Sequence, residues 1–239
     1  MPELFPAQSP AVAEVGKQAA ALNAATVPTE LKAAVQFQKT YLKILAAKEN
    51  KGSKASSPEP DWVNELRAFV AADRENDPVV HGVADVARAW LARVEMRSID
   101  AALRQYYRRN VRFPEQFSAV EASLAEGLRR DPWGEAWSYQ PCAPEGLAKL
   151  AGQRYRIGPA RFPDLGTLEE AAGGKQTVPP AWKISLRNIG GKRTLEFRLD
   201  GSFVTVEAGG VAGPSARLLY IGEGWALMAG RDQLFAVTF

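Results

Sequence analysis

The side chains that most often carry covalent or metal chemistry are scarce in this chain. Among its 239 residues it has one cysteine, Cys142, and one histidine, His81. A single cysteine excludes an internal disulfide and a zinc site built from several cysteines, and a single histidine excludes a site built on a histidine pair. A Ser-His-Asp arrangement is compatible with the count, with His81 as its one possible imidazole.

The surroundings of these two residues argue against catalysis. His81 follows Pro78 by three residues, in the first turn of a predicted helix, where the helix dipole disfavours an imidazolium. Cys142 lies between Pro141 and Pro144 with no histidine nearby in the sequence. Carboxylates are plentiful, but no spacing marks one as a general acid and another as a general base. We therefore predict no enzymatic activity and no cofactor. The alternative is an enzyme whose active-site cleft brings carboxylates together with His81 or with arginines.

Basic residues gather on and just after one predicted helix. The net charge of +3 and the isoelectric point near 9.0 are too modest to predict nucleic-acid binding, and no alternation of aromatic and basic residues accompanies the arginines. Two interpretations stay open, a contact surface for an anionic membrane or an acidic protein, and a solvated helix face. The candidate contact residues are Arg97, Arg104, Arg108, Arg109 and Arg112.

Hydrophobic periodicity predicts helices in the first half of the chain. Apolar residues make up 46% and charged residues 24%, an ordinary balance for a globular protein. Apolar side chains at three- and four-residue spacing predict helices over 11–25 and 26–48, a short helix over 62–74 capped by Asp61, and a long helix over 78–109. Between the second and third helices, residues 49–60 are rich in Lys, Ser, Gly and Pro and predict an exposed loop.

Alternating apolar residues predict strands in the second half. Short strands are expected near 137–139 and 154–157, and about six more follow residue 180, with the hairpin signal Asp200-Gly201 between two of them. The chain therefore belongs to the α+β class, with N-terminal helices, a long helix packed on a small antiparallel sheet, and a C-terminal β-rich barrel or sandwich. The expected regions are 1–50, a linker at 51–60, a module at 61–172 and a β-rich domain at 178–239.

Two phrases at the end of the long helix carry the most information. In the pattern aLxxYyxdngxYP, the first phrase is matched by Ala102, Leu103, Tyr106, Tyr107, Asn110, Phe113 and Pro114. In the pattern DPWGnpYxY, the second is matched by Asp131, Pro132, Trp133, Gly134, Trp137 and Tyr139, and Pro141 follows two residues later. With them the chain resembles the major pseudopilin of type II secretion systems and its relatives in the type IV pilin superfamily. The resemblance is firm over 99–141 and extends to about 78–172.

Physical reasons accompany these residue types. Pro114 disfavours continuation of the preceding helix, Asp131-Pro132 favours an extended segment and then a turn, and Gly134 allows a turn that a side chain would resist. Trp133 offers a large ring to hold the turn against the helix. The candidate site is therefore a structural motif, made of Tyr107, Pro114, Asp131, Pro132, Trp133, Gly134 and Tyr139.

The resemblance also implies a calcium loop. Family members often carry an acidic loop after the first strands, and the corresponding segment here retains Asp164, Glu169 and Glu170. Calcium takes six to eight oxygen ligands. Together with backbone carbonyls, these three carboxylates supply only part of that number of ligands. Calcium is the only metal that the sequence suggests.

The resemblance implies a function in the cell envelope. It predicts a non-catalytic protein of a secretion or pilus-type assembly, in the envelope or periplasm, whose partners are other components of that assembly. The family's apolar N-terminal helix does not precede the long helix here. We therefore expect either an anchor upstream of this sequence or reuse of the pilin-like module in a soluble protein. The alternative is a soluble adaptor, periplasmic or cytoplasmic, whose β domain binds a peptide or glycan through Trp182, Trp225 and Tyr220.

Overall fold

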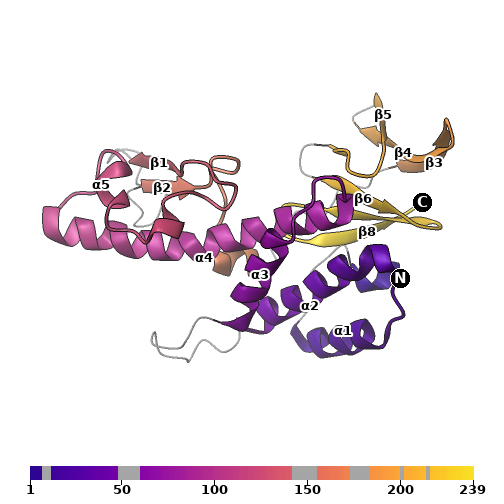
Figure 1. The fold of residues 1–239 in the computed structure, drawn as a ribbon, viewed down its shortest axis with the longest axis horizontal. Helices are drawn as coiled ribbons and strands as arrows, with labels where there is room; N and C mark the ends of the chain where they lie inside the picture. Colours follow the sequence, from indigo (N-terminus) through magenta and orange to yellow (C-terminus); the bar gives the residue numbers. More distant parts are fainter. Residues whose placement is uncertain (7–11, 48–59, 142–154, 173–182, 200–201, 214–215) are drawn as a thin grey trace. The chain divides into compact units, whose positions relative to one another are not determined.

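The longest element is the helix α4 (Pro78–Asn110). It belongs to a computed structural model that describes residues 1–6, 12–47, 60–141, 155–172, 183–199, 202–213 and 216–239. The chain divides into two compact units, the first made of Met1–Ala87 and Glu169–Phe239 and the second of Arg88–Leu168. Helix α4 is labelled in Figure 1. The division falls within this helix, so its start belongs to the first unit and its remainder to the second.

The helices expected in the first half are confirmed. They are α1 (Val12–Ala24), α2 (Lys32–Ala47) and α3 (Asp61–Ala71), with short 3-10 helices at Pro2–Leu4 and Thr29–Leu31. Asp61 is the first residue of α3 rather than its cap, and Pro60 takes the cap position without a side-chain hydrogen bond. Asp77 caps α4, because its Oδ1 accepts the N–H groups of Val79 and Val80 at 3.1 Å each.

The second unit packs the long helix on a small sheet. Strands β1 (Ser138–Pro141) and β2 (Tyr155–Gly158) pair antiparallel, and the chain between α4 and β1 forms the short helix α5 (Ser118–Glu121) and a 3-10 helix at Glu126–Leu128. A single apolar cluster joins helix and sheet, with Ala92, Ile99, Leu103, Val120, Leu124, Trp137, Tyr155 and Leu165 as its buried members. Helix α6 (Leu168–Ala172) follows.

Six C-terminal strands form two separate antiparallel sheets. One contains β3 (Lys183–Ile189), β4 (Lys192–Leu199) and β5 (Ser202–Val206), and the other contains β6 (Arg217–Ile221), β7 (Trp225–Ala229) and β8 (Leu234–Thr238). Both sheets contribute to one apolar core, from Leu195 and Phe197 in β4 to Met228 in β7. The expected α+β class is therefore confirmed.

The barrel alternative is wrong, because the described strands do not close. Closure requires every strand to pair on both sides. Here β3 and β5 border one sheet, and β6 and β8 border the other. One of these edges is covered by the N-terminus, since the Phe5 carbonyl accepts the Ala236 N–H at 2.7 Å. That contact removes exposed strand edge without continuing the sheet.

The two turns in the sheet of β3, β4 and β5 occur where the sequence has residues that favour tight hairpin turns. β4 and β5 pair up to Leu199 and Ser202, as the Asp200-Gly201 signal predicts, although residues 200–201 themselves lie outside the described part. β3 and β4 are joined at Gly190 and Gly191, whose φ angles are 60° and 82°. Two consecutive positive φ angles are what a two-residue hairpin turn with the native strand twist requires.

Candidate functional site

The centre of the second unit is the turn formed by Asp131 and the residues after it. Asp131 is 4% exposed, and its Oδ1 accepts the N–H groups of Trp133 and Glu135 at 2.9 Å each. Its Oδ2 accepts the N–H of Ala160 at 3.0 Å. The carboxylate thus holds its own turn closed and ties it to the segment that follows β2. Because both oxygens are engaged by backbone donors, the group serves structure rather than acid–base chemistry.

The glycine of this turn is required by its backbone conformation. Gly134 has a φ of +87°, and a Cβ atom added there would find nothing within 4 Å. The space is open, so the restriction comes from the positive φ alone. Its N–H donates to the Asp131 carbonyl at 2.8 Å, and the Asp131 N–H donates to the Glu135 carbonyl at 2.8 Å. Pro132, between Asp131 and Trp133, is half-buried.

Two tryptophans share the role that was predicted for Trp133 alone. Trp137 is 5% exposed within the apolar cluster, and its indole N–H donates to the Leu128 carbonyl at 2.9 Å. Trp133 is half-buried and meets Phe162 edge-on at 5.7 Å between centroids, with the Arg161 guanidinium 5.9 Å from its ring. Trp137 therefore holds the segment before β1 in the core, and Trp133 packs the turn against the loop after β2.

Tyrosine hydroxyls connect the small sheet to the end of the long helix. The Tyr139 hydroxyl donates to the carbonyl of the buried Pro114 at 2.8 Å. The Tyr155 hydroxyl donates to Asp100 Oδ1, and the Arg104 Nε donates to Asp100 Oδ2 at 2.6 Å. Burial of the phenol, with the Asp100 carboxylate beside it, raises the pKa of Tyr155 above its ordinary value. This hydroxyl therefore remains protonated and acts as a donor.

Helix α4 ends before Pro114, and the residue that follows the helix has an unusual backbone conformation. Val111 has a φ of +59°, and its N–H donates to the Tyr107 carbonyl at 2.7 Å. This single bond from a left-handed residue is a common way to end a helix, but the residue is usually glycine. The Asn110 side chain also donates to the Tyr106 carbonyl at 2.9 Å. Pro114 thus follows a helix that these two residues have already ended.

The aromatic residue of the first phrase supports this helix end. Tyr107 is half-buried and stacks on Phe113, with 4.8 Å between ring centroids. Phe113 in turn meets Tyr155 at 4.8 Å. The chain that leaves α4 is therefore folded back on the helix and against the sheet. Tyr107, Pro114 and Tyr139 come together around it, while Asp131, Pro132 and Gly134 form the separate turn.

The predicted basic residues are all exposed, but another arginine of the same helix is buried. Arg104 pairs with Asp100, and the other exposed members are Arg97, Arg108, Arg109 and Arg112. Arg93, on the same helix, is 1% exposed. It donates to the carbonyls of Gly166 at 3.1 Å and Ala89 at 3.0 Å, and it lies over the Trp90 ring. The sequence gives no sign that Arg93 is buried, because its partner Gly166 is distant in the chain.

The residues proposed for calcium are exposed. Asp164 belongs to the second unit, while Glu169 and Glu170 begin the part of the chain assigned to the first. Within the described residues, no group of three or more His, Cys, Asp or Glu side chains is placed to hold a metal ion. Calcium binding stays a prediction.

The lone histidine lies in the first unit between two carboxylates. His81 Nδ1 is 2.9 Å from Asp73 Oδ1, and its Nε2 is 4.0 Å from Asp85 Oδ2. The cluster joins the turn after α3 to the start of α4, and all three side chains are largely buried. No described serine or threonine is hydrogen-bonded to the imidazole, so the arrangement resembles a structural bridge more than a hydrolytic triad. Cys142 lies outside the described residues.

Of the rings invoked for a peptide- or glycan-binding β domain, the two that the structure describes lie side by side, and one of them is buried. Trp225 is 7% exposed, and its indole packs so closely on Gly222 that an added Cβ atom would approach it to 2.4 Å. Tyr220 is half-buried, 5.7 Å from Trp225 between centroids. Trp182 lies outside the described residues. Trp225 is therefore part of the fold of its sheet rather than a platform for a ligand.

Comparisons with known proteins add no relative. No family model, no curated protein and no solved structure matches the chain. Among the described helices, none combines the length and the apolar character needed to cross a membrane.

Proposed function

We propose that this chain is a non-catalytic component of a secretion or pilus-type assembly in the cell envelope, built on a pilin-like module and acting through protein–protein contacts. The proposal concerns the second unit, where both phrases of the resemblance lie. The family pairs a long helix with a small antiparallel sheet, and the second unit packs α4 on β1 and β2 in that way.

One observation carries the proposal. In the pattern aLxxYyxdngxYP, the position after asparagine is glycine, and in this chain that position is Val111. Val111 nevertheless takes the left-handed backbone conformation, with φ at +59°, which costs an ordinary residue about 1–2 kcal/mol and costs glycine little. The backbone thus follows the pattern where the side chain departs from it, which supports a shared architecture for the helix end.

The chemistry of the motif supports a role without catalysis. Asp131, Tyr139 and Tyr155 direct their polar atoms to backbone groups or to neighbouring side chains within the second unit. Such bonds hold a surface in shape, and a shaped surface is what a subunit of an assembly presents to its neighbours. The partners proposed here are other components of the secretion or pilus system.

The test is site-specific photo-crosslinking in the source organism with the full gene product. A photoreactive amino acid is placed at Ala101 or Gln105, which are exposed on α4, and crosslinked partners are identified by mass spectrometry. A matched position in the first unit is the exposed Lys183. We expect pilin-like or secretion components at the α4 positions, and we expect their loss when Asp131→Ala is introduced.

Two outcomes would overturn the proposal. One is crosslinking of α4 only to proteins outside secretion and pilus systems. The other is recovery of the chain solely in the cytoplasmic fraction, with normal protein secretion and normal pili when the gene is deleted. Either result would leave the fold of the second unit intact but remove its proposed role.

A further inference from the structure

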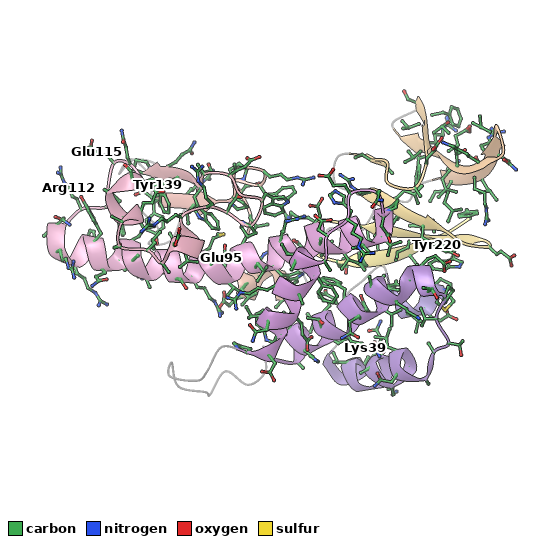
Figure 2. The ribbon with its side chains drawn as sticks, viewed as in Figure 1. Lys39, Glu95, Arg112, Glu115, Tyr139 and Tyr220 are labelled. Atoms are coloured by element: carbon green, nitrogen blue, oxygen red, sulfur yellow. The ribbon has the colours of Figure 1, made fainter. Side chains whose placement is uncertain are left out.

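The end of α4 carries a cluster of arginines that take no part in the side-chain hydrogen bonds and ion pairs of the described residues. Arg108, Arg109 and Arg112 are exposed, and within the described part of the chain none of their side chains forms a hydrogen bond or an ion pair. Val111 stands among them, 78% exposed. We call residues 108–112 the basic tip. Figure 2 shows Arg112 beside the end of α4, with Glu115 close by.

We infer that the basic tip binds the phosphate-rich surface of an anionic phospholipid membrane. The inference goes beyond the proposed function and does not depend on it, because the lipid surface is recognised by residues 108–112 alone. Three guanidinium groups within five residues match a surface of closely spaced phosphates, since each guanidinium presents several N–H donors in a planar fork.

Helix-end electrostatics explain only part of this cluster. Cations near a helix C-terminus interact favourably with the helix dipole, and the effect fades within the last turn. That accounts for Arg108 and Arg109, which belong to α4. Arg112 lies past Val111, where the chain has already turned away from the helix axis. The acidic residue nearest in sequence, Glu115, is exposed and, within the described residues, forms no ion pair with the tip.

Val111 distinguishes a lipid surface from other anionic partners. A side chain held outward by an unfavourable backbone conformation, and left 78% exposed, is an apolar group presented to the surroundings. A membrane offers both a phosphate layer for arginines and apolar material just beneath it. The backbone of a nucleic acid offers no such layer. An acidic protein surface would account for the arginines, but it would give Val111 no specific role.

The charge distribution favours the approach of this unit to an anionic surface. The second unit contains 13 Lys and Arg residues against nine Asp and Glu residues, which gives +4, whereas the first unit carries −1. Of those 13 basic residues, 12 are arginines. A locally positive unit is drawn to an anionic leaflet over about a Debye length, and each basic residue at the surface strengthens binding about fivefold.

The experiment is sedimentation of the purified full chain with vesicles. Vesicles of phosphatidylcholine with 30% phosphatidylglycerol are compared with pure phosphatidylcholine, at about 50 mM and about 500 mM salt. We expect binding to the anionic vesicles at low salt, little binding to neutral vesicles, and loss at high salt. The triple variant R108Q/R109Q/R112Q should bind about a hundredfold more weakly. R108K/R109K/R112K keeps the charges but loses the planar forks, and its binding should fall between that of the wild-type chain and that of the glutamine variant.

A matched variant separates the tip from net charge. R129Q/R130Q/R156Q removes the same three charges from exposed arginines of the same unit, and we expect it to lose less than fivefold. Val111→Gly adds a second readout. It should weaken vesicle binding about fivefold, because the apolar group is gone, while thermal stability stays equal or rises. A purely structural Val111 would leave vesicle binding unchanged.

Several results would overturn the inference. They are no binding to anionic vesicles at low salt, an equal loss in both triple variants, or unchanged binding in Val111→Gly. A fourth is tip-dependent binding to polyglutamate or to single-stranded RNA that exceeds binding to the vesicles, which would assign the tip to an acidic protein or to nucleic acid. None of these measurements involves a secretion component, so their failure is separate from failure of the proposed function.

Discussion

The second unit and the C-terminal sheets of the first unit are stabilised in different ways. The two sheets bury a mainly apolar core, with Leu195, Phe197, Leu218 and Met228 fully covered, although Thr194 in β4 is buried as well. The second unit has a two-stranded sheet and relies on buried polar side chains that bind backbone, above all Asp131 and Arg93. A two-stranded sheet is marginal by itself. Long-range polar bonds therefore add order to the apolar cluster that joins this sheet to α4.

The two kinds of stabilisation predict different responses to mutation. Removing an apolar side chain leaves a cavity whose cost is shared by the surrounding core. Removing a polar side chain that serves several backbone donors leaves those donors unsatisfied at specific places along the chain. Hydrogen exchange, which reports stability amide by amide, distinguishes the two responses.

The largest expected effect is that of Phe197→Ala. Phe197 is fully buried in the core shared by both C-terminal sheets, so the substitution should lower the free energy of unfolding of this region by about 4 kcal/mol. Amides of β4 and β7 should lose protection together in hydrogen exchange, while those of β1 and β2 keep theirs. The control is Phe203→Ala, at a side chain that is 66% exposed, with an expected change under about 0.5 kcal/mol.

Asp131→Ala should destabilise the second unit by about 3 kcal/mol. It removes the acceptor for the N–H groups of Trp133, Glu135 and Ala160, and hydrogen bonds to a charged group are each worth about 1.5–3 kcal/mol. The loss of protection should begin at these three amides. Asp164→Ala, an exposed carboxylate of the same unit, is the control. Full retention of protection at Ala160 would show that its hydrogen bond to Asp131 is not needed to stabilise the segment after β2.

Alkaline pH should weaken the second unit through Tyr155. Its pKa is raised in the folded protein by burial and by Asp100. The phenol of the unfolded chain ionises above its ordinary pKa of about 10, and the folded one does not. The stabilisation is therefore complete below pH 10 and declines as the pH rises further. At pH 11 the loss is about 1.4 kcal/mol.

Chemical denaturation at pH 8 and pH 11 measures this loss. Tyr155→Phe should remove this part of the pH dependence, although it lowers stability at both pH values because the hydroxyl no longer binds Asp100. Tyr220→Phe in the first unit serves as the control. An identical pH slope in the wild-type chain and in Tyr155→Phe would contradict the assignment.

The smallest expected effect is a gain. Val111→Gly should stabilise the second unit by up to about 1 kcal/mol. The reason is that relief of the left-handed strain, about 1–2 kcal/mol, exceeds the entropy cost of glycine, about 0.5–1 kcal/mol. Val111→Asn should fall between the two, since asparagine tolerates this conformation better than valine. Thermal unfolding measures both variants, and a decrease for Val111→Gly would mean that the valine side chain makes contacts that stabilise the fold.

The local features of the fold follow from the sequence. The apolar periodicity predicts α1, α2 and the long α4, and the alternating residues with Asp200-Gly201 predict the paired strands β4 and β5. These features depend on side chains a few residues apart, which is the range that periodicity and turn chemistry describe. The sequence left both a closed barrel and separate sheets open for the C-terminal strands, because strand patterns do not reveal which edges stay open.

The candidate site shows the same limit residue by residue. Composition, spacing and the Asp131-to-Gly134 phrase establish that this is a helix-and-sheet chain poor in catalytic residues, with a turn after its long helix. Only the tertiary structure decides that Asp131 reaches Ala160, that Arg93 is buried against Gly166, and that Trp137 rather than Trp133 enters the core. Each of these depends on which distant backbone group lies within hydrogen-bonding reach, and packing of the whole unit sets that distance.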